Sequence, residues 1–280
     1  MSHTHSSTYD SDEYYVAGAS RLSPAFDRLL RILDRWRTRV VVRRTGLKTG
    51  RVLDVGAGDG RVLHFMRQLG FEVHGTTVSQ KSANAARALF GLSLDVSDSL
   101  AEVLATGPFD LVTYWHVYEH LEVPCRHTAR WTELVRPGGF IVIEVPNTRS
   151  VGARLCRDAW LGSDDKHHVN PQAAEPLLGA LHATGFDVVR TRQFAVKYSY
   201  AYLWSALLGR LFGGRYDFDG ILRILKAPLN MARARPWWTF NALASIGYLA
   251  PAVLTLMLYG LMTNQGEVLR VYASRRSADH

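Results

Sequence analysis

The sequence predicts an α/β protein built on a doubly wound, mostly parallel sheet. Three observations support this prediction. Strand-like apolar segments alternate with helix-like segments across residues 51–145, a glycine-rich loop follows the first strand, and polar residues stand where successive strands end. Ligands of such sheets bind beyond the carboxyl ends of the strands, where the strand order reverses. We therefore expect a ligand crevice at that edge of the sheet.

The composition is that of a globular chain with a basic surface. The 280 residues are 47% hydrophobic and carry a net charge of +8, which is enough apolar content for a sizeable core and favours an anionic neighbour. Cys125 and Cys156 form neither a metal-binding spacing nor a disulfide framework, as in a reducing compartment. Residues 1–20 are polar and acidic, without the pattern of a secretory signal, and we expect a mobile arm there.

Residues 1–48 combine this arm with a basic amphipathic helix. Ser23 and Pro24 form a typical helix start. An apolar stripe at helical spacing follows, made of Phe26, Leu29, Leu30, Leu33, Trp36 and Val40. The remaining faces carry arginines, namely Arg31, Arg35, Arg37, Arg39, Arg43 and Arg44. Such basic faces are commonly solvated, and contact with an anionic lipid surface is the alternative.

The glycine-rich loop lies in the stretch Arg51–Arg61. A short apolar strand runs into glycine at positions 56, 58 and 60, and a helix follows and ends at Gly70. Glycine lets the backbone turn sharply and approach a ligand closely, while the helix offers free N–H groups. Asp54 closes the strand with a carboxylate. The spacing departs from a dinucleotide fingerprint, because Arg61 stands where the last glycine would be.

Further strands are expected at 72–75, 92–94, 109–114 and 140–145, and after them at 188–194 and 267–274. Ser79 and Gly91 delimit a helix between the second and third strands, and another helix is expected from Pro124 to Val135. Polar residues mark the strand ends: Thr77, Asp95, Asp98, Trp115 and His116. For Asp95 and Asp98 two interpretations stay open, either contact with a ligand or capping of the helix that follows.

The glycine loop and a second block, FDLV…EHL…LVRPGGFIVIEVPN, resemble the class I S-adenosylmethionine (SAM)-dependent methyltransferases. Both blocks stand in the order and at about the distance found in that family, and the resemblance covers roughly residues 50–194 plus the final strand. It implies a Rossmann-like, seven-stranded sheet with a reversed edge strand. It also implies SAM as the cofactor.

The resemblance assigns roles to the strand-end residues. The methionine end of the cofactor would be held by Asp54, Gly56, Ala57, Gly58 and Gly60. Thr77 would take the ribose, although the family usually has an acidic residue there, and a neutral contact should be weaker. Asp95 with Trp115 would face the adenine.

Three histidines are candidate general bases: His116, His120 and His168. His168 resembles a histidine in the branch of the family that acts on small molecules. The adjacent His167 and His168 lack further ligands at a recognised spacing, so no metal is expected. An oxygen acceptor is favoured over nitrogen or carbon by resemblance alone.

Residues 198–265 predict a hydrophobic helical insert between the last two strands of a core formed by 49–197 and 266–280. No charged residue occurs from Pro236 to Gly266, a run long enough to cross a bilayer. A single crossing would separate the last strand from its own sheet, so we expect a broken, re-entrant or interfacial hairpin, interrupted at Pro251 and the glycines at 247 and 260. A lid over an apolar pocket and a dimer interface are the alternatives.

Together these features predict a cytoplasmic methyltransferase, peripheral or monotopic at the inner face of the membrane. It would methylate a small or lipid-linked acceptor at an anionic membrane surface, and nucleic acid is the less favoured partner. A non-catalytic, membrane-associated protein with this fold is the first alternative. An NAD(P)-dependent oxidoreductase is the second, but it would need G-x-G-x-x-G and an acidic residue at position 77.

Overall fold

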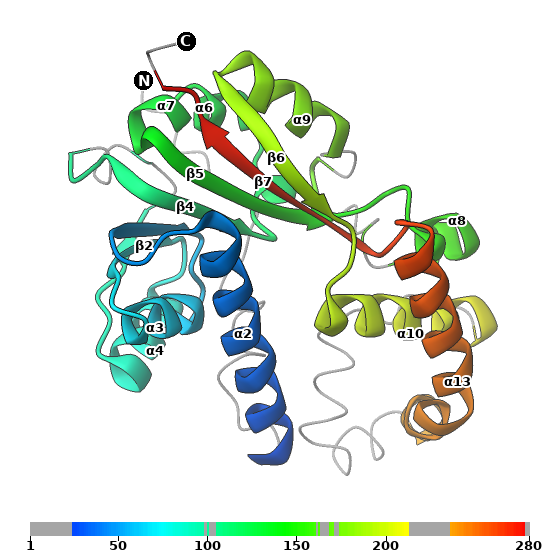
Figure 1. Ribbon diagram of the computed structural model, residues 1–280. Helices are drawn as coiled ribbons and strands as arrows, with labels where there is room; N and C mark the ends of the chain where they lie inside the picture. Colours follow the sequence, from blue (N-terminus) through cyan, green and yellow to red (C-terminus); the bar gives the residue numbers. More distant parts are fainter. Residues whose placement is uncertain are drawn as a thin grey trace, which may run out of the picture.

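The computed structural model describes residues 24–97, 100, 105–160, 162, 168–170, 174–212 and 236–277. In these residues seven strands form one sheet in the order β3-β2-β1-β4-β5-β7-β6. Their bounds are β1 Arg51–Val55, β2 Glu72–Thr77, β3 Asp95–Val96, β4 Phe109–Trp115, β5 Val135–Pro146, β6 Phe186–Arg192 and β7 Val268–Arg275. The predicted seven-stranded α/β fold is confirmed (Figure 1).

The first five strands are parallel, and β7 runs antiparallel to both β5 and β6. The reversed strand thus lies one place in from the edge, between β5 and β6. The strand order reverses between β1 and β4, which places the expected crevice at the carboxyl ends of these two strands.

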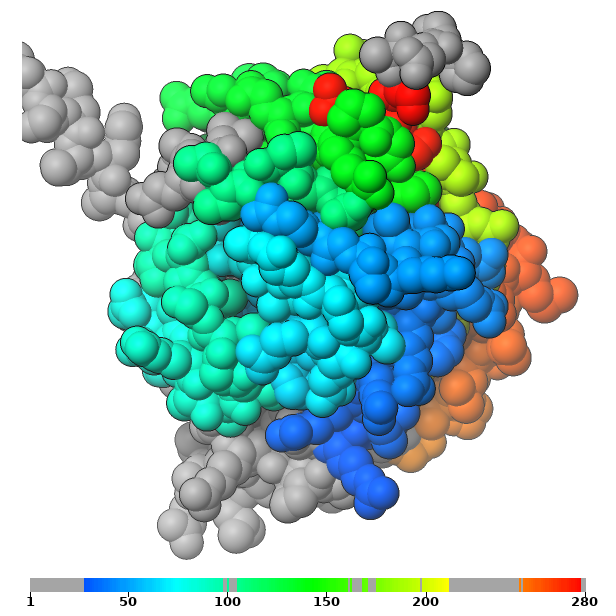
Figure 2. All heavy atoms as spheres, turned by 60° about the vertical axis from the view of Figure 1, so that its left-hand side comes forward, coloured from blue at the N-terminus to red at the C-terminus, as the bar shows by residue number. Residues whose placement is uncertain are grey.

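Helices cover both faces of the sheet. One core contains Trp131 of α7 (Trp131–Leu134) and Leu177 of α9 (Ala174–Ala183), packed on β1, β4, β5 and β7. The opposite core joins α2 (Pro24–Thr45) and α3 (Arg61–Gln68) to the other face. In Figure 2, α2 runs in blue along the surface beside the helices drawn in cyan, which include α4 (Gln80–Phe90).

Some element boundaries differ from the prediction. The helix expected from Pro124 to Val135 is two short helices, α6 (Pro124–Thr128) and α7, because the chain turns at Ala129 and Arg130. Strand β5 begins at Val135 instead of at 140 as expected, and its register shifts against β4 in the added part. The third strand lies at 95–96, because Leu92 and Leu94 pack against α4.

The buried face of α2 is not the predicted apolar stripe. Trp36 of that stripe is 54% exposed, whereas Asp34, Arg37 and Val41 are buried. The interpretation of Arg37 as part of a solvated or lipid-facing surface was therefore wrong. Its guanidinium pairs with Asp34 at 3.3 Å and with Glu144 of β5 at 3.8 Å, so the face of the helix that meets the sheet carries paired charges beside the apolar Val41.

Between β6 and β7 the chain forms α10 (Val196–Phe212) and α13 (Pro236–Met262), which pack against each other. The expected interruption was wrong, because α13 continues through Pro251. Within the described residues, no helix combines the length and apolar content needed to cross a membrane. The outer side of α13 nevertheless exposes large apolar side chains, namely Leu254, Leu258, Tyr259, Leu261 and Met262.

Candidate functional site

The crevice is built where the loop after β1 meets the segment after β4. Gly56, Gly58 and Gly60 have φ values of 69°, 57° and 75°, a region that side chains disfavour. A Cβ at Gly56 would lie 2.5 Å from Cγ2 of Val117, so the absence of a side chain lets these two segments touch. The structure therefore brings the glycine loop beside the histidine-containing segment, as the sequence predicts.

Backbone hydrogen bonds fix the loop to β2. The Gly56 amide donates to Thr76 Oγ1 at 3.2 Å, and the Ala57 amide donates to the Thr76 carbonyl at 2.7 Å. Thr77 is buried, and its hydroxyl oxygen accepts from the Ser79 amide at 3.3 Å. The hydroxyl hydrogen of Thr77 remains able to donate to a ligand.

Asp54 lies beneath the loop rather than in the open crevice. It is 1% exposed, and its Oδ1 accepts from Thr113 Oγ1 at 2.6 Å. Burial raises the pKa of Asp54 to about 7, although the Thr113 hydrogen bond and the Arg37 charge both act in the opposite direction. In this position Asp54 links β1 to β4 under the glycine loop.

Asp95 and Trp115 are not brought together. Asp95 is exposed on β3, and the strands β1 and β2 separate it from β4. Trp115 is buried between the guanidinium groups of Arg37, 4.3 Å from its ring, and Arg270, 5.1 Å away. Trp115 is thus part of a cation–π stack under α2. Asp98 and His167 lie outside the described residues.

His116 stands between two buried carboxylates. Its Nδ1 lies 3.2 Å from Glu119 and its Nε2 lies 3.4 Å from Glu144, and its backbone is left-handed with a φ of 54°. Burial alone would lower the pKa of His116, but the neighbouring Tyr198, Glu119 and Glu144 outweigh it and raise the pKa to about 10. His116 is therefore an imidazolium at neutral pH.

Sequence reasoning missed the charge cluster behind His116. Glu144 is fully buried, and its Oε2 accepts from Arg270 Nε at 2.7 Å. Burial alone would raise the pKa of Glu144, but Arg270, His116 and Arg37 hold it far below its usual range. The available signal was a charged residue inside an apolar strand, which both Glu144 and Arg270 provide.

A second group joins Glu119, His120 and His168. The two imidazole rings are 4.8 Å apart, and His168 Nδ1 lies 3.1 Å from the Gly162 carbonyl oxygen. One possible ligand atom from each of the three residues lies within 4.8 Å of the other two. Glu119 is buried, and both histidines are partly exposed. Such a set can hold a metal ion or move a proton.

Comparisons with known proteins give one family. A methyltransferase domain family matches residues 21–191. The chain is 37% identical over 111 residues to "Ubiquinone biosynthesis O-methyltransferase" of Aromatoleum aromaticum, covering 38% of this chain and 47% of the relative. The chain thus spans about half the length of the curated relatives it matches.

Solved structures share the fold. A SAM-dependent methyltransferase from Archaeoglobus fulgidus superposes with a TM-score of 0.54 at 19% identity, covering 88% of this chain and 94% of the other. The [4+2]-cyclase SpnF superposes with a TM-score of 0.52 at 21% identity, covering 87% and 81%. Because a cyclase shares the fold, the fold alone does not select the reaction.

Proposed function

This chain belongs to the methyltransferase domain family, with SAM as its cofactor, and from that premise we propose that it methylates an oxygen of a small or lipid-linked acceptor. The observation that carries the proposal is the contact of the glycine loop with the segment after β4, at the point where the strand order reverses. The relatives named O-methyltransferases support oxygen as the acceptor atom.

The residues at this point fit the cofactor. The loop from Gly56 to Gly60 allows close backbone approach. At the start of α3 the Arg61 amide already donates to Asp59 Oδ1 at 3.2 Å, so a ligand carboxylate would meet the N–H groups that follow it. Thr77 would donate to a ribose hydroxyl, and Asp95 would accept from the adenine side. Asp54 would support the loop at the methionine end. Trp115 would act through packing, since it lies away from Asp95.

SAM would supply a methyl group activated by its positively charged sulfonium sulfur, and the neutral thioether formed on transfer would be the leaving group. The protein's task is to place the acceptor in line and to remove its proton. Among the three histidines, we assign removal of the acceptor's proton to the pair His120 and His168, because His116 is already protonated at neutral pH. Glu119 would orient this pair. His116 would instead contribute a fixed positive charge beside the acceptor.

The exposed apolar surface supports action at a membrane. Leu29, Ile32 and Trp36 of α2 and the outer side chains of α13 are exposed, and both helices extend to the same side of the sheet (Figure 1). Together with the arginines of α2, this surface suits an anionic bilayer at the inner face of the membrane. A lid over an apolar acceptor is the alternative for α10 and α13.

The test is calorimetric titration of the full chain with SAM and with NADH, followed by transfer of labelled methyl groups to hydroxylated aromatic acceptors with and without apolar chains. We expect SAM to bind, NADH not to bind, and His120→Ala to remove most of the transfer while SAM affinity is kept. Binding of SAM without transfer to any hydroxyl would contradict methylation. Loss of transfer on chelation would assign Glu119, His120 and His168 to a metal instead of to the proton.

Vesicle sedimentation tests the membrane part separately. The full chain should pellet with anionic vesicles and bind more weakly at high salt, because the charge contribution is screened and the apolar one is not. A chain that stays in the supernatant as a detergent-free monomer would make the insert a lid.

A further inference from the structure

A recessed groove lies apart from the glycine loop, between α2 on one side and β6, β7 and the end of α13 on the other. It has a volume of about 390 Å³, which falls within the usual range of small-molecule sites. No residue assigned above to the cofactor or to proton transfer lines it. Any ligand of this groove would therefore be distinct from the cofactor and from the acceptor at the histidines.

Four exposed arginines surround the groove: Arg39, Arg43 and Arg44 from α2 and Arg192 from the end of β6. No acidic residue lines it, and none of the four arginines forms an ion pair with a carboxylate of the described part of the chain. Four like charges around one hollow repel one another unless an anion binds between them. Arginine side chains match the oxygens of a phosphate group in pairs.

The same groove has an apolar wall. Trp36, Phe194 and Leu261 line it from α2, from the residues after β6 and from α13. Trp36 is 54% exposed and Leu261 is 46% exposed, so both present apolar surface that lacks a partner in the described residues. A free inorganic anion would leave this wall wet, whereas a ligand with an attached apolar chain would cover it.

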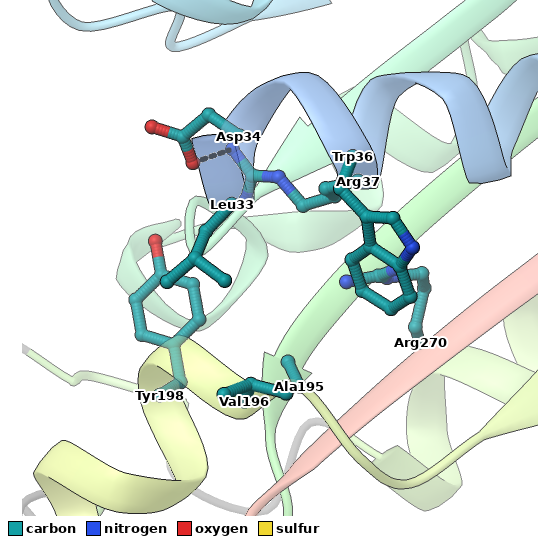
Figure 3. A pocket seen from close by; sticks show the side chains of 8 residues that line it. All are labelled: Leu33, Asp34, Trp36, Arg37, Ala195, Val196, Tyr198 and Arg270. Carbon is teal, nitrogen blue, oxygen red and sulfur yellow. Dashed lines mark ion pairs between the residues drawn. The ribbon is translucent and has the colours of Figure 1, made fainter. Parts of the chain in front are cut away.

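The floor consists of Arg270 and Tyr272 of β7, which are 5% and 2% exposed. A flat bilayer surface cannot reach a floor that is buried to this extent, but one molecule entering the groove can. A smaller hollow adjoins it, sharing Trp36 and Arg270, and reaches Arg37 and Tyr198 (Figure 3). Figure 3 shows Arg37 turned toward Asp34, so this cation is already paired and does not face the groove.

We propose that this groove binds a single phosphorylated amphiphile, with the phosphate between Arg43, Arg44 and Arg192 and the apolar chain along Trp36, Phe194 and Leu261. The site adds a ligand to the proposed function without depending on methyl transfer. The ligand is a dispersed molecule that enters the groove. The alternative source of the phosphate group is a lipid headgroup that stays in the bilayer.

The experiment titrates the full chain with octyl phosphate, octanol and inorganic phosphate, following tryptophan fluorescence and calorimetric heat. Octyl phosphate should bind at one site and at least tenfold more tightly than either fragment, because only it meets both the arginines and the apolar wall. Equal affinity for octanol would overturn the proposal, since the arginines would then contribute nothing.

A matched pair of variants locates the site. Arg43→Gln/Arg192→Gln removes two charges from the groove, and Arg87→Gln/Arg126→Gln removes two exposed charges from α4 and α6, outside it. The first variant should lower the affinity for octyl phosphate at least tenfold, and the second should lower it less than twofold. The circular dichroism spectrum and the SAM affinity should be unchanged in both variants. An equal loss of affinity in the two variants would mean that only the net charge of the protein matters, and it would overturn the proposed site.

Vesicles of phosphatidic acid separate the two sources of phosphate. Saturable binding of octyl phosphate, competing with the vesicles, supports a molecule held in the groove. Sedimentation with these vesicles without saturable octyl phosphate binding would overturn the proposal in favour of a membrane surface. Because SAM is titrated in the same samples, failure of the groove is distinguishable from failure of the methyltransferase assignment.

Discussion

Different interactions stabilise the two sides of the crevice. The glycine-loop side depends on backbone geometry, with three glycines at positive φ fixed to β2 by main-chain amides. The histidine side depends on charge, with His116 and Arg270 gathered around the fully buried Glu144. A backbone motif is local and tolerates change in its surroundings, whereas a buried charge cluster fails if one partner is removed.

The largest effect should come from breaking the charged side. Glu144→Ala would leave Arg37, Arg270 and His116 without their shared carboxylate, and we expect a loss of about 3–5 kcal/mol in the free energy of unfolding. Urea denaturation followed by circular dichroism measures this loss. A control, Glu133→Ala, removes an exposed carboxylate paired with Arg130 and should cost less than about 1 kcal/mol. Equal costs would show that the charged side is not held by Glu144.

This difference also explains what sequence reasoning found. The glycine loop, the capping of α4 by Ser79 and Gly91, and most strands were predictable because each depends on residues close in the chain. The buried face of α2 was not, because apolar periodicity selects Trp36 and cannot register an ion pair between Arg37 and Glu144 of a distant strand. The contacts of the Trp115 ring with Arg37 and Arg270 were not predictable for the same reason, because both arginines come from distant elements.

The next effect should appear on the backbone side. Gly58→Val places a branched side chain at a φ of 57°, where the ligand is expected to approach, and SAM affinity should fall at least 100-fold. Gly91→Val is the matched control, because Gly91 has a φ of 59° and open space around it. Both variants should lose about 1–2 kcal/mol of stability from strain, and only the first should lose SAM in calorimetry. Retained affinity in a folded Gly58→Val protein would contradict the cofactor site.

A smaller effect should appear where the two sides meet, at Asp54. Its pKa of about 7 in the folded protein exceeds its unfolded value, so the folded state keeps a proton that the unfolded state releases. Its contribution to stability is therefore fully present below pH 4 and is lost as the pH rises toward and through about 7. Asp54→Asn keeps an acceptor for Thr113 but cannot ionise.

We therefore expect the stability of the native protein, relative to Asp54→Asn, to fall by roughly 1–4 kcal/mol between pH 4.5 and 8 without cofactor. Thermal unfolding of both proteins over that range gives the difference. If the stabilities of the two proteins changed with pH in parallel, Asp54 would be ionised in the folded protein. Asp54 would then belong, with Arg37, to the charged side of the crevice.

The smallest effect should come from Thr77, where the backbone side departs from the family pattern. Thr77→Asp restores a carboxylate at the end of β2, and charge-assisted hydrogen bonds run at about twice the strength of neutral ones, so SAM should bind about 1 kcal/mol more tightly. The new carboxylate can also keep the hydrogen bond from the Ser79 amide that Thr77 Oγ1 now accepts. Thr76→Asp is the control, because a carboxylate there can likewise keep the hydrogen bond from the Gly56 amide but would face the loop instead of the ribose, so SAM affinity should not rise. Weaker binding by Thr77→Asp would show that the pocket has adapted to threonine, and that the backbone side, like the charged side, depends on its particular side chains.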